Sequence, residues 1–215
     1  MHLIAMLTML IDHIGYIFFP DEQALRAIGR LSFPIYCYAL VQGHVHTTNR
    51  FKYLLRLSVI AALSQIPYIL ALNPFGFNVV ASLLAAALVL AVWDYPYKDL
   101  PRRLLAGIPA TAAACALLEF LPFSYGAYGL LLVLTFRFAK SSQLVGLQFA
   151  LNLAYMAYTE ITIQFLSLIP AIAIVTGPSI WTRMEKMTFP RWIWRAFYTT
   201  HLADLAILKV LLLPS

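Results

Sequence analysis

A few ionisable side chains stand inside long apolar segments of this 215-residue chain. They are Asp12, His13, Arg30, His201 and Asp204, and the amides of Gln65 and Asn152 accompany them. An ionisable group in apolar surroundings is costly, so each is a candidate for a functional site unless a neighbour only satisfies it. We expect the set to line a polar path through the molecule.

His13 carries the side chain best suited to acid–base chemistry near neutral pH. A neutral imidazole can take the proton of an amine or hydroxyl as that group attacks a thioester, and a nearby carboxylate would hold the imidazole tautomer. Asp12 or Asp204 is the expected carboxylate. Asp12 and His13 point about 100° apart on a helix, whereas His201 and Asp204 share a face at i and i+3. A histidine that only hydrogen-bonds a neighbouring helix for packing fits the same pattern.

Two further candidates have more than one interpretation. Arg30 is either a contact for an oxyanion or a substrate carboxylate, or a structural counter-charge for Asp12. His44 and His46 are spaced like a metal pair, but no third ligand of suitable spacing follows them. We therefore expect no metal site.

The segments that must position these groups have the composition of a membrane protein. Hydrophobic residues make up 62% of the chain and charged residues 11%, against roughly 25% charged in soluble domains. The mean hydropathy is +0.80. We therefore predict an all-α, polytopic membrane helix bundle, with residues 1–215 forming a single transmembrane domain that contacts lipid and no nucleic acid.

The chain divides into nine candidate spans of up to about 20 residues. They lie near 3–19, 24–43, 53–72, 78–94, 103–121, 125–139, 143–158, 162–180 and 196–213. The first segment lacks a basic leader and a small-residue cleavage site, so we interpret it as a retained span. At 1.5 Å per residue, His13 lies near the bilayer midplane and Gln65 at a similar depth.

Every second connection between these spans is rich in lysine and arginine. These connections hold 12 of the 15 basic residues: Arg50, Lys52, Arg56, Lys98, Arg102, Arg103, Arg137, Lys140, Arg183, Lys186, Arg191 and Arg195. The positive-inside rule then predicts a cytoplasmic N-terminus and an external C-terminus. The net charge of +6 is thus concentrated on one face. Topology alone explains this concentration, and an anion site is the alternative.

The basic and aromatic link from Trp181 to Arg195 favours an amphipathic helix that lies on the inner leaflet. A lid over a donor pocket is the other interpretation. The oligomeric state stays open, with a homo-oligomer among the options, because no stripe of small residues stands out on one helix face.

An ordered series of segments resembles the TraX family, named for the F-pilin acetylase. The segments are "IAMLTMLIDHIGYIFFP" from Ile4, "RAIGRLSFPIY" from Arg26, "HTTNRFKYLLRL" from His46, "SQIPY" from Ser64, "YGAYG" from Tyr125 and "FYTTHL" from Phe197. The likeness covers nearly the whole chain and thins between about residues 85 and 120. It implies a multi-pass protein of the bacterial inner membrane.

The resemblance also implies membrane-embedded acetyl transfer from cytosolic acetyl-CoA. TraX-like proteins are grouped with transmembrane acyltransferases, among them the acyltransferase-3 family and heparan-alpha-glucosaminide N-acetyltransferase, in which a histidine of the first-helix region is the proposed catalytic group. By position, His13 inherits that role, and Asp12 would assist or orient it. Arg30 matches a position expected to face the site. His201 ranks below His13, because Thr200 precedes it where the family commonly has a proline nearby.

The donor end is implied by the segment between the second and third spans. His46, Asn49 and Arg50 match a family landmark at the cytoplasmic end of the second span, and Lys52 follows it. Phosphates are best held by arginine and lysine at a positively charged mouth, so we expect these four residues to meet the phosphates or pantetheine arm of CoA.

Several alternatives stay open. The acceptor can be a pilin N-terminus, a sugar or a small amine, and transfer can be direct or pass through an acetyl-histidine. A non-catalytic transporter or proton-relay protein is the main alternative to an enzyme, and an assembly scaffold is a third option. The absence of an internal repeat disfavours an inverted-repeat transporter.

Overall fold

A computed structural model of the chain describes residues 2–177 and 191–212, and this part is built from helices. The helices are α1 (His2–Phe18), α2 (Gln23–Gly29), α3 (Ser32–His46), α4 (Arg50–Ala71), α5 (Val79–Trp93), α6 (Leu100–Phe120), α7 (Gly126–Phe138), α8 (Ser141–Thr159), the 3-10 helix η1 (Thr162–Ser167), α9 (Leu168–Thr176) and α11 (Arg191–Leu212). The predicted all-α class is confirmed for the described residues. Most of the link from Trp181 to Arg195 lies outside them.

Each predicted span has a helical counterpart, but the second span is not one helix, and the eighth begins with the 3-10 helix η1 before α9. The range 24–43 is divided between α2 and α3, with turn residues at Arg30 and Leu31. Pro34 gives the physical reason: inside a continuous helix it would leave the carbonyl of Arg30 unbonded, and its ring would clash with that carbonyl. At the third position of α3, by contrast, a missing N–H costs nothing. The hydroxyl of Ser32 donates to the carbonyl of Gly29 at 2.8 Å and closes the turn.

The length of the helices bears on the membrane prediction. By length and composition, α4 and α6 are the described helices able to cross a membrane, while α1, α5, α7 and the segment Thr162–Thr176 are apolar but shorter. Large apolar side chains are exposed on the outer surface, among them Phe75, Leu105 and Phe120. The number of nine spans stays a prediction.

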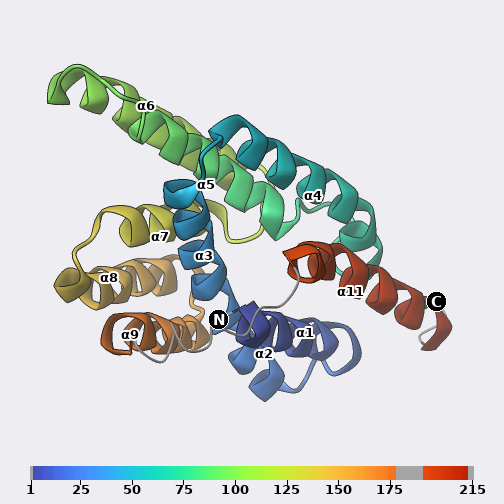
Figure 1. Ribbon diagram of the computed structural model, residues 1–215. Coiled ribbons are helices and arrows are strands. Elements are labelled where there is room, and N and C mark those ends of the chain that lie inside the picture. The colour runs from blue at the N-terminus through green and yellow to red at the C-terminus, as the bar shows by residue number, and fades with distance from the viewer. Residues whose placement is uncertain (1, 178–190, 213–215) are drawn as a thin grey trace.

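Helix α3 stands at the centre of the molecule (Figure 1). It contacts α1, α2, α4, α5, α7, α9 and η1. Helix α11 packs against both α4 and α1, so the last described helix closes the side of the molecule on which the first one lies. This arrangement brings segments from the two ends of the chain to one place.

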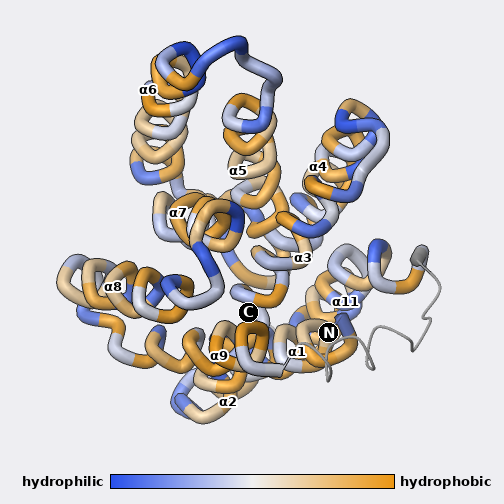
Figure 2. Tube along the Cα trace, turned by 60° about the vertical axis from the view of Figure 1, so that its left-hand side comes forward, coloured by the Kyte–Doolittle hydropathy of each residue, from blue (hydrophilic) through white to orange (hydrophobic). Residues whose placement is uncertain are grey.

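Three of the four predicted basic connections meet at one end of the molecule around Asp94, and most of the fourth lies outside the described residues. The guanidinium of Arg137 donates to both carboxylate oxygens of Asp94, at 2.9 and 3.0 Å. Arg50 donates to the Asp94 carbonyl at 2.8 Å, and Nε2 of His44 lies 3.2 Å from the carboxylate. In Figure 2 the link between α5 and α6 and the neighbouring end of α4 are hydrophilic, whereas the body of α5 is largely apolar.

The opposite ends of the same helices meet around Ser124. The hydroxyls of Tyr68 and Ser124 lie 3.0 Å apart, and Ser82 donates to the carbonyl of Ser124 at 2.6 Å. The amide of Phe77 donates to the carbonyl of Pro122 at 2.9 Å. The connections of α4 to α7 therefore alternate between two ends, as the distribution of basic residues predicts.

Candidate active site

A cavity of about 770 Å³ lies between α1, α2, α3, α4 and α11. From α1, α2 and the turn after α2 it is lined by Asp12, His13, Tyr16, Arg26 and Arg30. From the α3–α4 turn and the first turns of α4 and α11 it is lined by His46, Thr47, Thr48, Asn49, Lys52, Arg56, Trp194 and Arg195. His46, Thr48 and Asn49 are exposed, so the cavity opens to the surface there. One space thus connects the predicted catalytic histidine with the predicted donor end.

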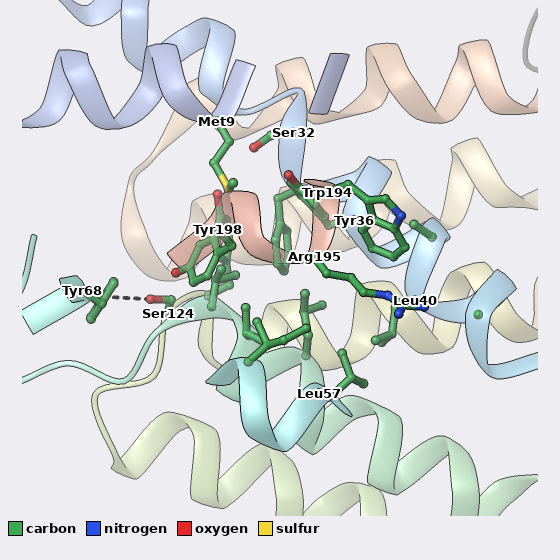
Figure 3. Close-up of a pocket in the computed structure, with 18 of the residues that line it drawn as sticks. Met9, Ser32, Tyr36, Leu40, Leu57, Tyr68, Ser124, Trp194, Arg195 and Tyr198 are labelled. Atoms are coloured by element: carbon green, nitrogen blue, oxygen red, sulfur yellow. Dashed lines mark hydrogen bonds between the residues drawn. The ribbon is translucent and has the colours of Figure 1, made fainter. Parts of the chain in front are cut away.

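Aromatic side chains line the middle of the cavity. Tyr36 and Tyr198 lie in the middle of the cavity beside Trp194, with Met9 above them and Leu57 below them in Figure 3. Sequence reasoning placed Trp194 in an amphipathic link on the inner leaflet and missed the aromatic lining of the cavity.

His13 contacts a second histidine across the α1–α11 interface. Its Nδ1 lies 2.9 Å from Nε2 of His201, which is 188 residues away in the sequence. The ring planes differ by 6° while the centroids stay 5.1 Å apart, so the rings meet edge to edge. His201 is 5% exposed and does not line the cavity, whereas His13 does. The two predicted histidines are thus brought together, with His201 behind His13.

Asp12 faces α2. Its carboxylate is 2.8 Å from the guanidinium of Arg26, which also donates to the Asp12 carbonyl at 3.3 Å. Gly29 permits the approach, because a Cβ at that position would overlap the Asp12 side chain. The ion-pair partner of Asp12 is therefore Arg26, which sequence reasoning missed, and the Nδ1 of His13 that a carboxylate was expected to hold is taken by His201.

Arg30 lines the cavity with much of its hydrogen-bonding capacity unused. Its Nη1 donates to Oε1 of Gln164 at the long distance of 3.4 Å. The buried Nε has no hydrogen-bond partner among the described residues. A guanidinium with spare donors on a cavity wall can bind an oxyanion or a carboxylate.

A buried polar network lies behind Arg30. Gln164 Nε2 donates to the hydroxyl of Tyr128 at 2.9 Å, and that hydroxyl donates to Oδ1 of Asn152 at 2.8 Å. Asn152 Nδ2 donates in turn to Oγ of Ser167 at 3.0 Å. All four side chains are buried, and they join α7, α8 and η1. Asn152 was singled out from the sequence, but the network holds Gln164, and through it Arg30, without lining the cavity.

Two of the predicted site-lining residues lie elsewhere. Gln65 donates to the carbonyl of Gly76 at 2.8 Å and accepts from the backbone N–H of Asn78 at 3.1 Å, so it braces the α4–α5 loop. Asp204 is exposed on α11. Neither residue lines the cavity, and the polar path runs through Asp12, His13 and Arg30 instead.

Of the residues predicted to bind the acetyl donor, some line the cavity and one does not. His46 ends α3, and Asn49 caps α4 by accepting from the backbone N–H of Lys52 at 2.9 Å; all three line the cavity. Arg50 turns away toward Asp94 and does not line it. Arg56 does line it, and its spacing of four residues from Lys52 was the signal that sequence reasoning missed.

Comparison with known proteins gives two matches. A family model described as TraX protein matches residues 1–209. A probable fimbrial assembly protein FimC, serogroup H1, of Dichelobacter nodosus is 38% identical over 66 residues, which cover 29% of this chain and 27% of that protein. The chain thus matches about a quarter of the length of this curated relative. No solved structure matches.

Proposed function

The chain belongs to the TraX family, and from that premise we propose that it is a membrane-embedded acetyltransferase, which moves an acetyl group from cytosolic acetyl-CoA to an amine or hydroxyl. The observation that carries the proposal is the single cavity that joins His13 to a basic, surface-open mouth. An enzyme of this kind needs a base that both a thioester and a nucleophile can reach, and a lone buried histidine would not provide one.

The mouth suits the nucleotide end of CoA. Lys52 and Arg56 on α4 and Arg195 on α11 contribute three cations around one opening. Such a cluster binds phosphates through charge-assisted hydrogen bonds, and it also attracts a polyanion by its long-range field. Trp194 lines the same opening, and one face of its ring is stacked on His2 with centroids 4.6 Å apart. The acetyl-bearing arm then extends along the aromatic lining toward His13.

The reaction begins as His13 accepts a proton from the acceptor's amine or hydroxyl. The freed electron pair attacks the thioester carbonyl and forms a C–N or C–O bond. The tetrahedral intermediate then collapses, the C–S bond breaks with its electron pair on sulfur, and His13 returns the proton to the thiolate. The products are the acetylated acceptor and CoA, and the histidine is regenerated.

Arg30 fits the oxyanion of that intermediate. Preorganised donors aimed at developing negative charge commonly supply the largest single stabilisation in acyl transfer. The spare donors of Arg30 and its support by Gln164 meet that requirement. A guanidinium held from behind by a buried network keeps its place as the charge develops.

The location we propose is the bacterial inner membrane, with multiple spans. The exposed apolar side chains and the two helices of membrane-crossing length support it. Among acceptors, the name of the Dichelobacter nodosus relative, a probable fimbrial assembly protein, favours the N-terminal amine of a pilin-like peptide over a sugar or a small amine. Its match covers a minority of both chains, so acceptors of all three classes belong in the test.

The experiment is CoA release by the purified protein in proteoliposomes, with acetyl-CoA and each acceptor class. We expect acceptor-dependent release that His13→Asn reduces by roughly 10²- to 10⁴-fold, the usual contribution of a general base. Asn retains an amide near the position of Nδ1, so the contact with His201 can survive while the base is lost. Solute flux without CoA release would support a transporter, and a His13→Asn variant with unchanged behaviour would support a scaffold. Either result would overturn the proposal that the protein is an enzyme.

A further inference from the structure

We propose that His201 is the positioning residue of this site: it fixes the tautomer of His13 so that the Nε2 of His13 is the basic atom of the cavity. Its catalytic meaning rests on the proposed function, whereas the tautomer assignment stands on hydrogen bonds alone. The inference replaces the carboxylate that the sequence predicted as the orienting group.

His201 contacts the backbone of its own helix. Its Nδ1 lies 2.6 Å from the carbonyl oxygen of Phe197. A carbonyl oxygen only accepts hydrogen bonds, so Nδ1 of His201 must carry a proton. A neutral imidazole holds one proton, and Nε2 of His201 is therefore unprotonated. The backbone of α11 thus selects the tautomer of His201.

The tautomer of His201 in turn determines the tautomer of His13. The unprotonated Nε2 of His201 lies 2.9 Å from Nδ1 of His13. Two lone pairs at this distance would repel each other, so Nδ1 of His13 must donate. The edge-to-edge arrangement of the rings directs the N–H along the bond. His13 is then also an Nδ1–H tautomer, with its lone pair on Nε2.

The surroundings favour the neutral pair. The carboxylate of Asp12 pairs with Arg26 at 2.8 Å, and Asp204 is exposed on α11. Neither carboxylate therefore takes part in the hydrogen bonds of the His13–His201 pair. Burial disfavours a charge that no partner compensates. The ring of His201 is held by stacking on Phe197, with centroids 4.6 Å apart and planes 13° apart. Its orientation is therefore as fixed as its tautomer.

The arrangement performs the orienting task that a carboxylate has in a Ser-His-Asp triad, but with a neutral group. When Nε2 of His13 accepts the acceptor's proton, the imidazolium keeps its Nδ1–H bond to His201. A neutral partner stabilises that cation less than a carboxylate would. The proton is consequently held loosely and is readily returned to the departing thiolate.

The direct test is ¹⁵N NMR of histidine-labelled protein in detergent or nanodiscs, because protonated and unprotonated ring nitrogens have well-separated shifts. We expect both His13 and His201 as Nδ1–H tautomers at neutral pH. In His201→Phe, His13 should lose this tautomer, whereas in His201→Gln the amide oxygen can accept from Nδ1 and should retain it. A wild-type His13 protonated at Nε2, or one unchanged by His201→Phe, would overturn the inference.

The kinetic test separates positioning from structure. We expect His201→Phe to lower kcat for CoA release by on the order of 10²-fold with the KM for acetyl-CoA unchanged, and His201→Gln to restore most of the rate. Equal losses of kcat in both variants, with the fold intact, would contradict the positioning role. Nδ1–H tautomers in a protein that releases no CoA with any acceptor would support this inference and overturn the proposed function.

Discussion

Two clusters of charged side chains in the described part of the molecule differ in how far their charged groups are paired. Around Asp94, two hydrogen bonds from Arg137, the imidazole of His44 and the guanidinium of Arg103 surround one carboxylate. At the other cluster, the imidazole of His13 lines a large cavity, and Arg30 on the wall of the same cavity keeps spare donors. Saturated charge ties helix ends together, whereas unsaturated charge on a cavity wall can bind and react.

The sequence alone does not separate the two clusters. Each contains a histidine and an aspartate, and the closeness of His44 to Asp94, 50 residues further along, appears only in the fold. His44 is almost fully buried, 2% exposed, and faces Asp94, so a search for buried histidines alone would select it as readily as His13. The cavity makes the distinction, because a base must be reached by its substrates.

The largest effect should come from exchanging the same side chain in the two clusters. His13→Asn should reduce CoA release by roughly 10²- to 10⁴-fold, because the base is lost. His44→Asn, the matched control, should leave kcat within about twofold in the folded protein. A larger loss of kcat in His44→Asn than in His13→Asn would reverse the comparison.

An arginine exchange gives the next largest effect. Arg30→Lys keeps the charge but loses the planar fork, and we expect kcat to fall by on the order of 10²-fold. Arg103→Lys alters the Asp94 cluster by the same chemistry and should leave kcat unchanged. The measurement is steady-state CoA release for both variants, and an unaffected Arg30→Lys would remove the oxyanion role.

A smaller effect should appear at the mouth of the cavity. Replacement of both Lys52 and Arg56 by Gln should raise the KM for acetyl-CoA by about tenfold with little change in kcat, because the cations contact the donor far from the reacting bond. Arg50→Gln is the control, since Arg50 bonds to the Asp94 carbonyl. Equal KM values for the two proteins would place the donor phosphates elsewhere.

The smallest effect on catalysis should follow from Asp94→Ala. It leaves Arg137 without its partner and should lower the free energy of unfolding by about 1–3 kcal/mol. Thermal unfolding in detergent measures this loss, and kcat at a temperature where both proteins are folded should be unchanged. A stable Asp94→Ala protein with reduced kcat would show that this cluster takes part in the reaction.

The apolar segments of the sequence predict most of the helices. In an apolar environment the backbone must satisfy its own hydrogen bonds, so a long apolar segment forms a helix and the polar links form turns. Proline shows where this reasoning stops. The helix breaks before Pro34, yet α4 continues through Pro67 and α6 through Pro109. Local sequence does not say which helix has neighbours that tolerate a missing hydrogen bond, since this depends on packing.

The site was predictable where position along one helix was sufficient. His13, Arg30 and Lys52 line the cavity as expected, whereas Arg26, the ion-pair partner of Asp12, was missed. The pairing with His201 was not predictable, because it requires α1 to lie beside α11, 188 residues further along.

Gln65 illustrates the opposite error. A polar residue in an apolar segment can serve a loop as well as a ligand, and here it braces the backbone of Gly76 and Asn78. Only the fold reveals which task the amide has.

The central claim is that a thioester entering at the basic mouth reaches His13, and a structure with an acetyl-CoA analogue that carries a methylene in place of the thioester sulfur tests it most directly. The account predicts the diphosphate among Lys52, Arg56 and Arg195, and the ketone carbonyl beside Nε2 of His13 and the guanidinium of Arg30. An analogue bound outside the cavity, or one whose carbonyl is separated from His13 by closed protein, would contradict it.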